Sequence, residues 1–310
     1  MICPKALKKG DTIGLISASG ATPPEKLQPA IASIEKLGLN VVVGETCHAR
    51  HGYLAGTDEL RVADVHRMFD DPMIDGIFCI RGGYGATKIL AQLDFDLISA
   101  NPKVFAGYSD VTALHIAFNQ LCGFVTYHTP MPSTEFIRQE MDDYTWQSFI
   151  QLIMENERKA YYLKNPSHQP MSTLVPGSAS GQLIGGNLTL VTASLGTPYE
   201  IDTRGKILFL EDIDETEQRV DRMLTQLKLA GKLDDVAGIL LGAWTNCEPE
   251  NPEKPAHSLS LQTIFQEILM PLGKPIIADL ACGHCLPTMS LPLGRTIKMD
   301  ADNQRIHVVE

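Results

Sequence analysis

Basic residues are scarce in this chain of 310 residues. It contains 26 Lys and Arg against 37 Asp and Glu, so its formal net charge is −11 at pH 7. A protein that coats DNA or RNA, or that docks electrostatically on anionic lipid, needs clustered positive charge. The acidic balance argues against both classes. We therefore expect no nucleic-acid partner and no membrane partner, and a small molecule or another protein as the ligand.

Long apolar runs are also missing. The longest uncharged run, residues 181–199, is rich in Gly, Thr and Asn and is not a membrane span. Near the N-terminus, Asp11 and Gly14 interrupt the stretch that a signal peptide would keep apolar. The seven cysteines are scattered and odd in number, which favours free thiols in a reducing compartment over a disulfide framework. We therefore expect a cytoplasmic protein.

The chain does contain an alternation of short apolar runs with helical patterns, which is typical of a parallel α/β sheet. Residues 165–180 then carry three prolines among Ser, Thr and Gly, a composition that favours a linker. Further strand and helix patterns follow. We expect an α/β fold with an N-terminal parallel-sheet domain over 1–164, a linker over 165–180 and a smaller C-terminal α+β domain over 181–310.

A strand–turn–helix pattern surrounds Ser109. The apolar strand ends at Gly107, and a helical pattern begins directly after Asp110. A serine in such a turn projects its hydroxyl beside helix N-terminal amides, which can stabilise an oxyanion. In a nucleophile elbow, a glycine usually stands two residues after the serine. Here Val111 occupies that position, so the pattern resembles a nucleophile elbow without matching it fully. The alternative interpretation is that Ser109 and Asp110 merely cap the helix.

A glycine-rich segment, residues 81–85, follows another predicted strand and precedes a helical pattern over 86–93. Its glycines let the backbone approach a ligand and point N–H groups at an anion. The spacing matches neither the dinucleotide fingerprint nor a phosphate loop. Arg81 is either a solvated loop cation or a partner for a substrate carboxylate. A tight turn without a ligand remains the alternative for Gly82 and Gly83.

Five residues that include four acids follow the apolar run 207–210. Acids at the carboxyl end of a strand suit a catalytic crevice, whereas acids at a helix start complement the helix dipole. Glu211 is nearest to the strand end and is therefore the best-placed catalytic candidate. Asp212, Asp214 and Glu215 fit the start of the following helix better.

His284 lies between Cys282 and Cys285 on a predicted loop. The C-x-x-C spacing is that of a redox pair, but such a motif normally opens a helix, and prolines follow here. A zinc site would need a second pair of ligands with suitable spacing, so we expect no metal and no cofactor. A loop histidine is a credible general base. Two other histidines compete for this role on local sequence, His115 and His128.

Taken in order, these segments resemble the LD-carboxypeptidases, a group of serine peptidases that includes the microcin-immunity peptidases. The resemblance implies a triad with Ser109 as nucleophile, His284 as base and Glu211 as orienting acid. It also implies an oxyanion hole, an active site at the interface of the two domains, and a homodimer. The oxyanion hole would use the N–H of Asp110 with a second donor from Gly82 or Gly83. The resemblance runs through residues 7–15, 81–85, 106–110, 181–188, 208–212, 283–284 and 291–294.

The resemblance implies a carboxypeptidase that removes the terminal D-alanine from murein tetrapeptides during peptidoglycan recycling. An alternative within the family is an immunity-type enzyme that cleaves a peptidyl or aminoacyl-nucleotide conjugate. Nucleotide recognition would favour an aromatic platform, and Trp244 at a strand end is a candidate, although aromatic residues are only 6% of the chain. From another class, a non-catalytic module could hold a small anion on the glycine-rich segment.

Overall fold

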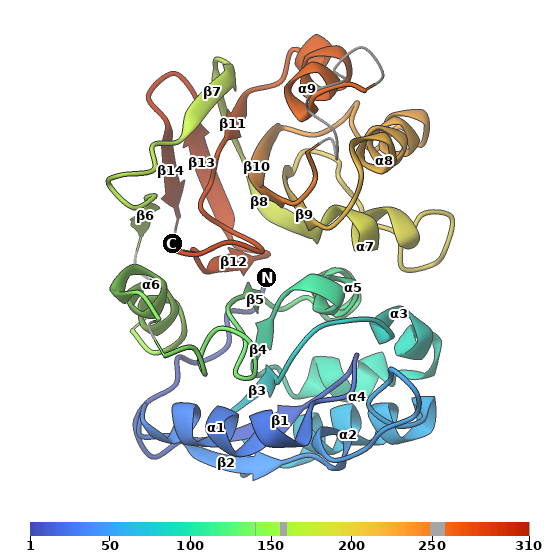
Figure 1. Ribbon diagram of the computed structural model, residues 1–310, viewed down its shortest axis with the longest axis vertical. Coiled ribbons are helices and arrows are strands. Elements are labelled where there is room, and N and C mark those ends of the chain that lie inside the picture. The colour runs from blue at the N-terminus through green and yellow to red at the C-terminus, as the bar shows by residue number, and fades with distance from the viewer. Residues whose placement is uncertain (140, 156–159, 249–257, 310) are drawn as a thin grey trace. The chain divides into compact units, whose positions relative to one another are not determined.

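The computed structural model describes residues 1–139, 141–155, 160–248 and 258–309 (Figure 1). The chain divides into two compact units. The N-terminal unit comprises Met1–Arg158 and Ser290–Gly294, and the C-terminal unit comprises Lys159–Met289 and Arg295–Glu310. Among the described residues, no helix is both long enough and apolar enough to cross a membrane.

A six-stranded sheet in the order β12-β5-β4-β3-β1-β2 forms the centre of the N-terminal unit. The first five strands of the chain run parallel, and β12 pairs antiparallel with β5. All residues of β3 and β4 are buried, as expected for a parallel sheet with both faces covered. The strands are β1 (Thr12–Ile16), β2 (Asn40–Val43), β3 (Gly76–Cys79), β4 (Val104–Gly107), β5 (Thr126–His128) and β12 (Leu291–Leu293).

Helices of the N-terminal unit alternate with these strands. A cluster of buried aromatic rings joins α2 to β4 and to the segment before β5, with ring centroids 4.9 to 6.1 Å apart among Phe69, Phe105, Phe118 and Phe124. These four rings are fully buried and contribute large apolar side chains to the core of the unit. The helical segments are α1 (Pro24–Glu35), η1 (Glu45–Cys47), α2 (Asp58–Asp70), α3 (Ala86–Ile89), η2 (Leu90–Gln92), α4 (Phe95–Ala100), η3 (Ser109–Val111), α5 (Thr112–Ala117), η4 (Phe118–Cys122) and α6 (Asp143–Ile153).

The C-terminal unit contains a mixed eight-stranded sheet in the order β6-β14-β13-β8-β9-β10-β11-β7. Its four central strands from β8 to β11 are parallel, and the outer strands are antiparallel to their neighbours. The strands are β6 (Tyr161–Leu163), β7 (Ser172–Val175), β8 (Ser178–Asn187), β9 (Ile207–Ile213), β10 (Gly238–Thr245), β11 (Ile276–Ala278), β13 (Thr296–Asp300) and β14 (Arg305–Val308).

Three helices of this unit, α7 (Leu188–Ala193), α8 (Glu217–Leu229) and α9 (Leu261–Ile268), lie along one side of it in Figure 1. A short 3-10 turn, η6 (Met270–Leu272), follows α9. The N-caps of α8 and α9 are Thr216 and Ser260, whose side chains accept hydrogen bonds from Arg219 N and Thr263 N. Such caps satisfy backbone donors that a helix start leaves unpaired, so these starts are fixed by local sequence.

The α/β fold class with a parallel N-terminal sheet is confirmed, but the domain division differs from the expected one. Residues 165–180 are not a free linker, because they contain β7 and the start of β8, which pair with β11 and β13. The three prolines, Pro166, Pro170 and Pro176, lie outside β7 and β8, so none of them removes an N–H from the ladders of these strands. Residues 290–294 belong to the N-terminal unit, because β12 pairs with β5.

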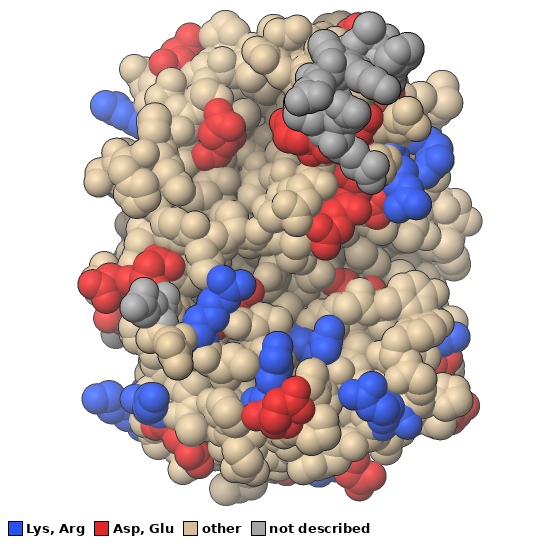
Figure 2. Space-filling model, viewed as in Figure 1, with Lys and Arg blue, Asp and Glu red and all other residues tan. Residues whose placement is uncertain are grey.

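Charged side chains of both signs are spread over the face of the molecule seen in Figure 2. They form separate small groups on this face, and Lys and Arg do not merge into one continuous basic field.

Candidate active site

Ser109 lies in the turn between β4 and η3. Its φ angle is 65°, in the left-handed region that residues other than glycine rarely adopt. A half-buried serine in this conformation at a strand-to-helix turn has the geometry of a nucleophile elbow. No side-chain cap bond is made at the start of η3 or of α5. The turn therefore has a conformation that helix capping does not explain.

The carboxylate of Asp110 connects this turn to the glycine-rich segment. Asp110 is 1% exposed, and its Oδ2 accepts a hydrogen bond of 2.8 Å from the N–H of Ala86, the first residue of α3. Burial raises the pKa of Asp110. On the other side of the segment, the fully buried Arg61 donates from Nη1 to the carbonyl of Gly85 at 2.7 Å. Both contacts fix the path of the segment beside Ser109.

Gly82 makes the closest approach to Ser109. A Cβ atom on Gly82 would lie 2.9 Å from Ser109 Cβ and 3.1 Å from Ser109 Oγ, so only glycine fits this position without a shift. The carbonyl of Gly82 accepts hydrogen bonds from the N–H of Gly20 at 3.2 Å and from Arg81 Nε at 3.3 Å. Gly83 lies against Gly20, because its Cβ would be 3.4 Å from Gly20 Cα. The structure thus brings Arg81, Gly82, Gly83 and Asp110 together near Ser109.

The two competing histidines of this unit are both buried. His115 is 0% exposed, and its Nε2–H donates to the carbonyl of Gly107 at 2.9 Å. Burial lowers the pKa of His115 to about 4, so the ring stays neutral at pH 7 and supports the turn from the interior. His128 is 1% exposed, with its ring 5.4 Å from that of Tyr108. Neither position suits a base that must meet a substrate.

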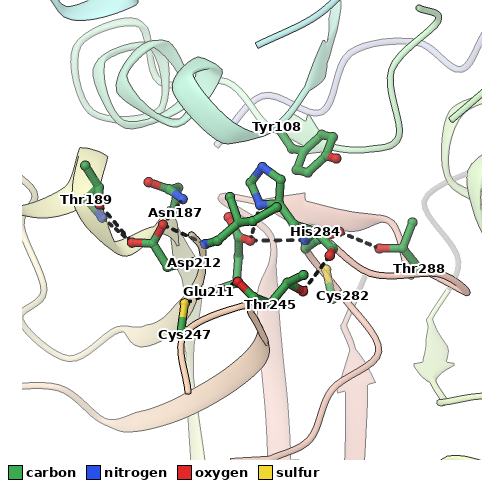
Figure 3. A network of polar contacts seen from close by, with 12 residues as sticks. Tyr108, Asn187, Thr189, Glu211, Asp212, Thr245, Cys247, Cys282, His284 and Thr288 are labelled. Atoms are coloured by element: carbon green, nitrogen blue, oxygen red, sulfur yellow. Dashed lines mark hydrogen bonds and ion pairs between the residues drawn. The ribbon is translucent and has the colours of Figure 1, made fainter. Parts of the chain in front are cut away.

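In the C-terminal unit, Glu211 and His284 form a close pair (Figure 3). His284 Nδ1 lies 2.7 Å from Glu211 Oε2, and the backbone N–H of His284 donates to the same oxygen at 3.2 Å. An ionised carboxylate only accepts hydrogen bonds, so Nδ1 carries the proton and the basic lone pair is on Nε2. The side chain of Glu211 is 0% exposed and that of His284 is 13% exposed. The pair thus has a buried orienting acid and an accessible imidazole.

Two neighbours hold the loop that carries His284. Thr245 Oγ1 donates to the carbonyl of His284 at 2.6 Å, which links the loop to the end of β10. A Cβ atom on Gly283 would lie 2.5 Å from Glu211 Oε2, so the carboxylate reaches the imidazole only because this residue is glycine. The local sequence Gly-His was therefore informative, although sequence reasoning missed the role of Thr245.

Glu211 and Asp212 differ in role because they are neighbours in a strand. Both were expected beyond the strand end, with Asp212 at a helix start, but β9 extends to Ile213 and includes both residues. Successive strand residues point to opposite faces. Glu211 faces His284, whereas Asp212, 2% exposed, accepts from Asn187 Nδ2 at 2.7 Å and from the N–H and hydroxyl of Thr189 at 2.9 Å each. Burial and the adjacent charge of Glu211 raise the pKa of Asp212.

Sequence reasoning did not find this Asp212 network, which Figure 3 shows beside the Glu211–His284 pair. The alternation in residues 207–213 is the signal that could have separated the two acids. Asp214 and Glu215 lie after the strand, and α8 begins at Glu217 with Thr216 as its cap. The expectation of helix-start acids is therefore wrong for Asp212.

The two thiols beside His284 contact backbone carbonyls. Cys282 Sγ donates to Met289 O at 3.1 Å and Cys285 Sγ to Pro287 O at 3.4 Å. Burial raises the pKa of Cys282 well above its ordinary value, which opposes formation of a thiolate. No group of three or more His, Cys, Asp or Glu side chains that could hold a metal ion occurs within the described part of the chain.

A strained serine on one α/β unit and a Glu–His pair on the other are the parts of a serine-type hydrolase. Comparison with known proteins gives the family. Residues 13–129 match the model of the LD-carboxypeptidase N-terminal domain, and residues 180–299 match that of the LD-carboxypeptidase C-terminal domain. The chain belongs to the LD-carboxypeptidase family, and it is a serine-type carboxypeptidase.

Individual relatives cover nearly the whole chain. A probable murein peptide carboxypeptidase of Bacillus subtilis is 46% identical over 297 residues, which are 96% of this chain and 91% of the relative. The structure of the microcin C7 self-immunity protein MccF in complex with aspartyl sulfamoyl adenosine has a TM-score of 0.90 at 27% identity, covering 100% of this chain and 99% of that one. A muramoyltetrapeptide carboxypeptidase from Oxalobacter formigenes has a TM-score of 0.82 at 27% identity, covering 96% and 99%.

Proposed function

We propose that this carboxypeptidase hydrolyses the L,D-amide bond of murein tetrapeptides and releases the terminal D-alanine. Ser109 is the nucleophile, His284 the general base and Glu211 the acid that orients the imidazole. The observation that carries the proposal is the contact of 2.7 Å between His284 Nδ1 and Glu211 Oε2, which leaves the basic lone pair on Nε2. The similarity to a murein peptide carboxypeptidase at 46% identity supports the substrate class.

The reaction follows from the roles of these groups. His284 Nε2 takes the proton from Ser109 Oγ as this oxygen attacks the carbonyl carbon of the L,D-amide. The buried carboxylate of Glu211 stabilises the imidazolium. The N–H of Asp110, with that of Gly82 or Gly83, would donate to the oxyanion of the tetrahedral intermediate. Collapse of the intermediate breaks the C–N bond, and His284 returns the proton to the amine of D-alanine.

Water completes the cycle. The retained peptide is then an ester of Ser109, and His284 removes a proton from a water molecule as it attacks this ester. The second tetrahedral intermediate expels Ser109 Oγ, which regains a proton from His284. The products are a tripeptide and free D-alanine. No step requires a metal ion or an organic cofactor.

The cellular setting is part of the same proposal. We propose that the enzyme acts in the cytoplasm during peptidoglycan recycling, and that it is a homodimer. All seven cysteines are free, which supports a reducing compartment. The homodimer rests on the family resemblance. Light scattering coupled to gel filtration would test it, with a mass of about one 34.0 kDa chain as the contrary result.

A direct test is to incubate the protein with a purified murein tetrapeptide and to follow the products by mass spectrometry. We expect loss of one alanine residue from the peptide and release of free D-alanine. A matched peptide with L-alanine at its end should remain uncleaved. Equal cleavage of both peptides would contradict the stereochemical part of the proposal, and cleavage of neither would contradict the proposed substrate class.

The alternative function is cleavage of an aminoacyl-nucleotide conjugate. MccF, whose solved complex contains aspartyl sulfamoyl adenosine, covers nearly the whole chain. Trp244 lines a cavity of about 600 Å³ in the C-terminal unit, and its ring centroid is 5.2 Å from that of Phe265. This alternative would be favoured if the protein hydrolysed aspartyl sulfamoyl adenosine and if Trp244→Ala lowered the rate of this hydrolysis. If the protein hydrolysed the murein tetrapeptide and not the nucleotide conjugate, this result would favour the murein carboxypeptidase function.

A further inference from the structure

The strand order of the N-terminal sheet singles out one position for a ligand. The chain passes from β1 to β2 on one side and later to β3 on the other, so the order reverses between β1 and β3. In open α/β sheets, ligands bind outside the carboxyl ends of the strands at this switch point. The loops at this point follow β1 and β3, and they meet through the hydrogen bond from Gly20 N–H to Gly82 O.

Arg81 lies between these two loops. Its Nη1 donates to the carbonyl of Ala21 at 3.0 Å and its Nε to the carbonyl of Gly82 at 3.3 Å. A Cβ atom on Gly83 would be 3.6 Å from Arg81 Nη2. Gly82 also contacts Ser109, so the cation and the nucleophile share one neighbour. Two bonds to carbonyls leave several of the five guanidinium donors available to an anion.

A second cation, Arg50, belongs to a third loop, which is fixed against the two loops that follow β1 and β3. The N–H of Ala21 donates to the carbonyl of Tyr53 at 2.9 Å, and the exposed rings of Tyr53 and Tyr84 meet edge to face with centroids 5.7 Å apart. Burial, and then the positive charge of the exposed Arg50, lower the pKa of Arg81. The two guanidinium groups are thus close enough to repel each other.

Neither Arg50 nor Arg81 forms an ion pair with an acidic side chain within the part of the chain that the structure describes. In a protein with 37 acids and 26 bases, two neighbouring cations without an acid are an unusual arrangement. Like charges destabilise each other unless an anion lies between them. A carboxylate ligand would supply this anion, because the planar guanidinium matches a carboxylate in a bidentate contact.

We propose that Arg81, with Arg50 beside it, binds the terminal carboxylate of the residue that the enzyme releases. The inference rests on the proposed carboxypeptidase function. In a peptide, the terminal carboxylate carbon is only three bonds from the scissile carbonyl carbon. Its binding group must therefore lie close to Ser109, and Arg81 shares the neighbour Gly82 with that serine. The pair of cations would make the enzyme select a free chain end over an internal peptide bond.

The test compares two substrates, the murein tetrapeptide with a free terminal carboxylate and the same peptide with a terminal carboxamide. For the wild-type enzyme, kcat/KM should be larger for the free acid by about 10- to 100-fold, the range for a hydrogen-bonded charge. In Arg81→Gln this ratio should fall to about threefold or less, mainly through a higher KM for the acid. Arg81→Lys should recover part of the ratio, because it keeps the charge without the fork.

Further variants separate binding from folding. Arg50→Gln, on an exposed loop, should lower kcat/KM for the acid by about three- to tenfold and leave the amide unchanged. Arg204→Gln, an exposed arginine of the C-terminal unit, is the matched control and should change neither substrate. Two results would overturn the inference: equal losses of kcat/KM on both substrates in Arg81→Gln, or a wild-type enzyme that does not prefer the free acid to the amide. In either case, cleavage of the tetrapeptide by the wild type would still support the proposed function. Absence of cleavage of either peptide by the wild type would overturn both.

Discussion

The buried His115 should make the stability of the protein depend on pH. Its imidazole is 0% exposed and donates to the carbonyl of Gly107, two residues before Ser109. Protonation would place a charge in an apolar interior beside the ring of Phe105, with centroids 5.6 Å apart. Burial therefore lowers the pKa of His115 to about 4, whereas an imidazole in the unfolded chain titrates near pH ~6.5.

The sign and size of the effect follow from these two pKa values. Between them the unfolded chain binds more protons than the folded protein, so the free energy of unfolding falls as the pH falls. We call the resulting decrease in the free energy of unfolding the penalty. It is absent above about pH 7 and complete below about pH 4, where it approaches roughly 3 kcal/mol. At about pH 5 it amounts to roughly 2 kcal/mol.

Urea denaturation at about pH 7.5 and about pH 5 would measure the penalty in the wild type and in His115→Gln, which cannot titrate in this range. Other groups also titrate, so the relevant quantity is the difference between the two proteins. Between these two pH values, the decrease in the free energy of unfolding should be smaller in His115→Gln than in the wild type by roughly 2 kcal/mol. His48→Gln, at an exposed histidine, should behave like the wild type. An equal pH-dependent loss in His115→Gln and the wild type would refute the reasoning.

Three further substitutions test the site. Glu211→Gln removes the negative charge beside the imidazole, so it should slow the enzyme and move the acidic limb of kcat/KM to lower pH. Asp212→Asn, on the opposite face of β9, should move this limb by less than about one pH unit. Gly283→Ala should lower kcat/KM by about tenfold or more, because the new Cβ would lie 2.5 Å from Glu211 Oε2. Gly273→Ala, also at positive φ but with no atom within 4 Å, is its control and should retain activity. Gly82→Ala should slow fluorophosphonate labelling of Ser109, because its Cβ would lie 3.1 Å from Ser109 Oγ; an unchanged labelling rate would speak against this contact.

The local parts of the site could be predicted from the sequence. The change from an apolar strand to a helical pattern around Ser109 is contained within a few residues, and so is the glycine-rich segment after β3. The residue types of Gly283 and His284 also indicated a loop histidine that could act as a general base. Each of these signals depends on neighbours in sequence, which is why composition and periodicity reveal them.

Other parts depend on pairing between distant residues and were not accessible in the same way. Residues 291–293 form β12 only because they pair with β5, far earlier in the chain. The strand β9 continues through Glu211 and Asp212 because β8 and β10 supply its partners on both sides. The charge of Asp212 is tolerated in the strand because Asn187 and Thr189 donate to it. A sequence pattern read one segment at a time contains none of these partners.

The central claim is that Ser109 and His284 act in one chemical step. Its most direct test is a double-mutant cycle on D-alanine release from the murein tetrapeptide, with Ser109→Ala, His284→Ala and the double variant, each checked for an unchanged unfolding midpoint. Each single substitution should lower kcat by about a thousandfold or more, and the double variant should be almost no slower than either one. Losses that multiply in the double variant, or a single variant that retains most of its turnover, would contradict the account.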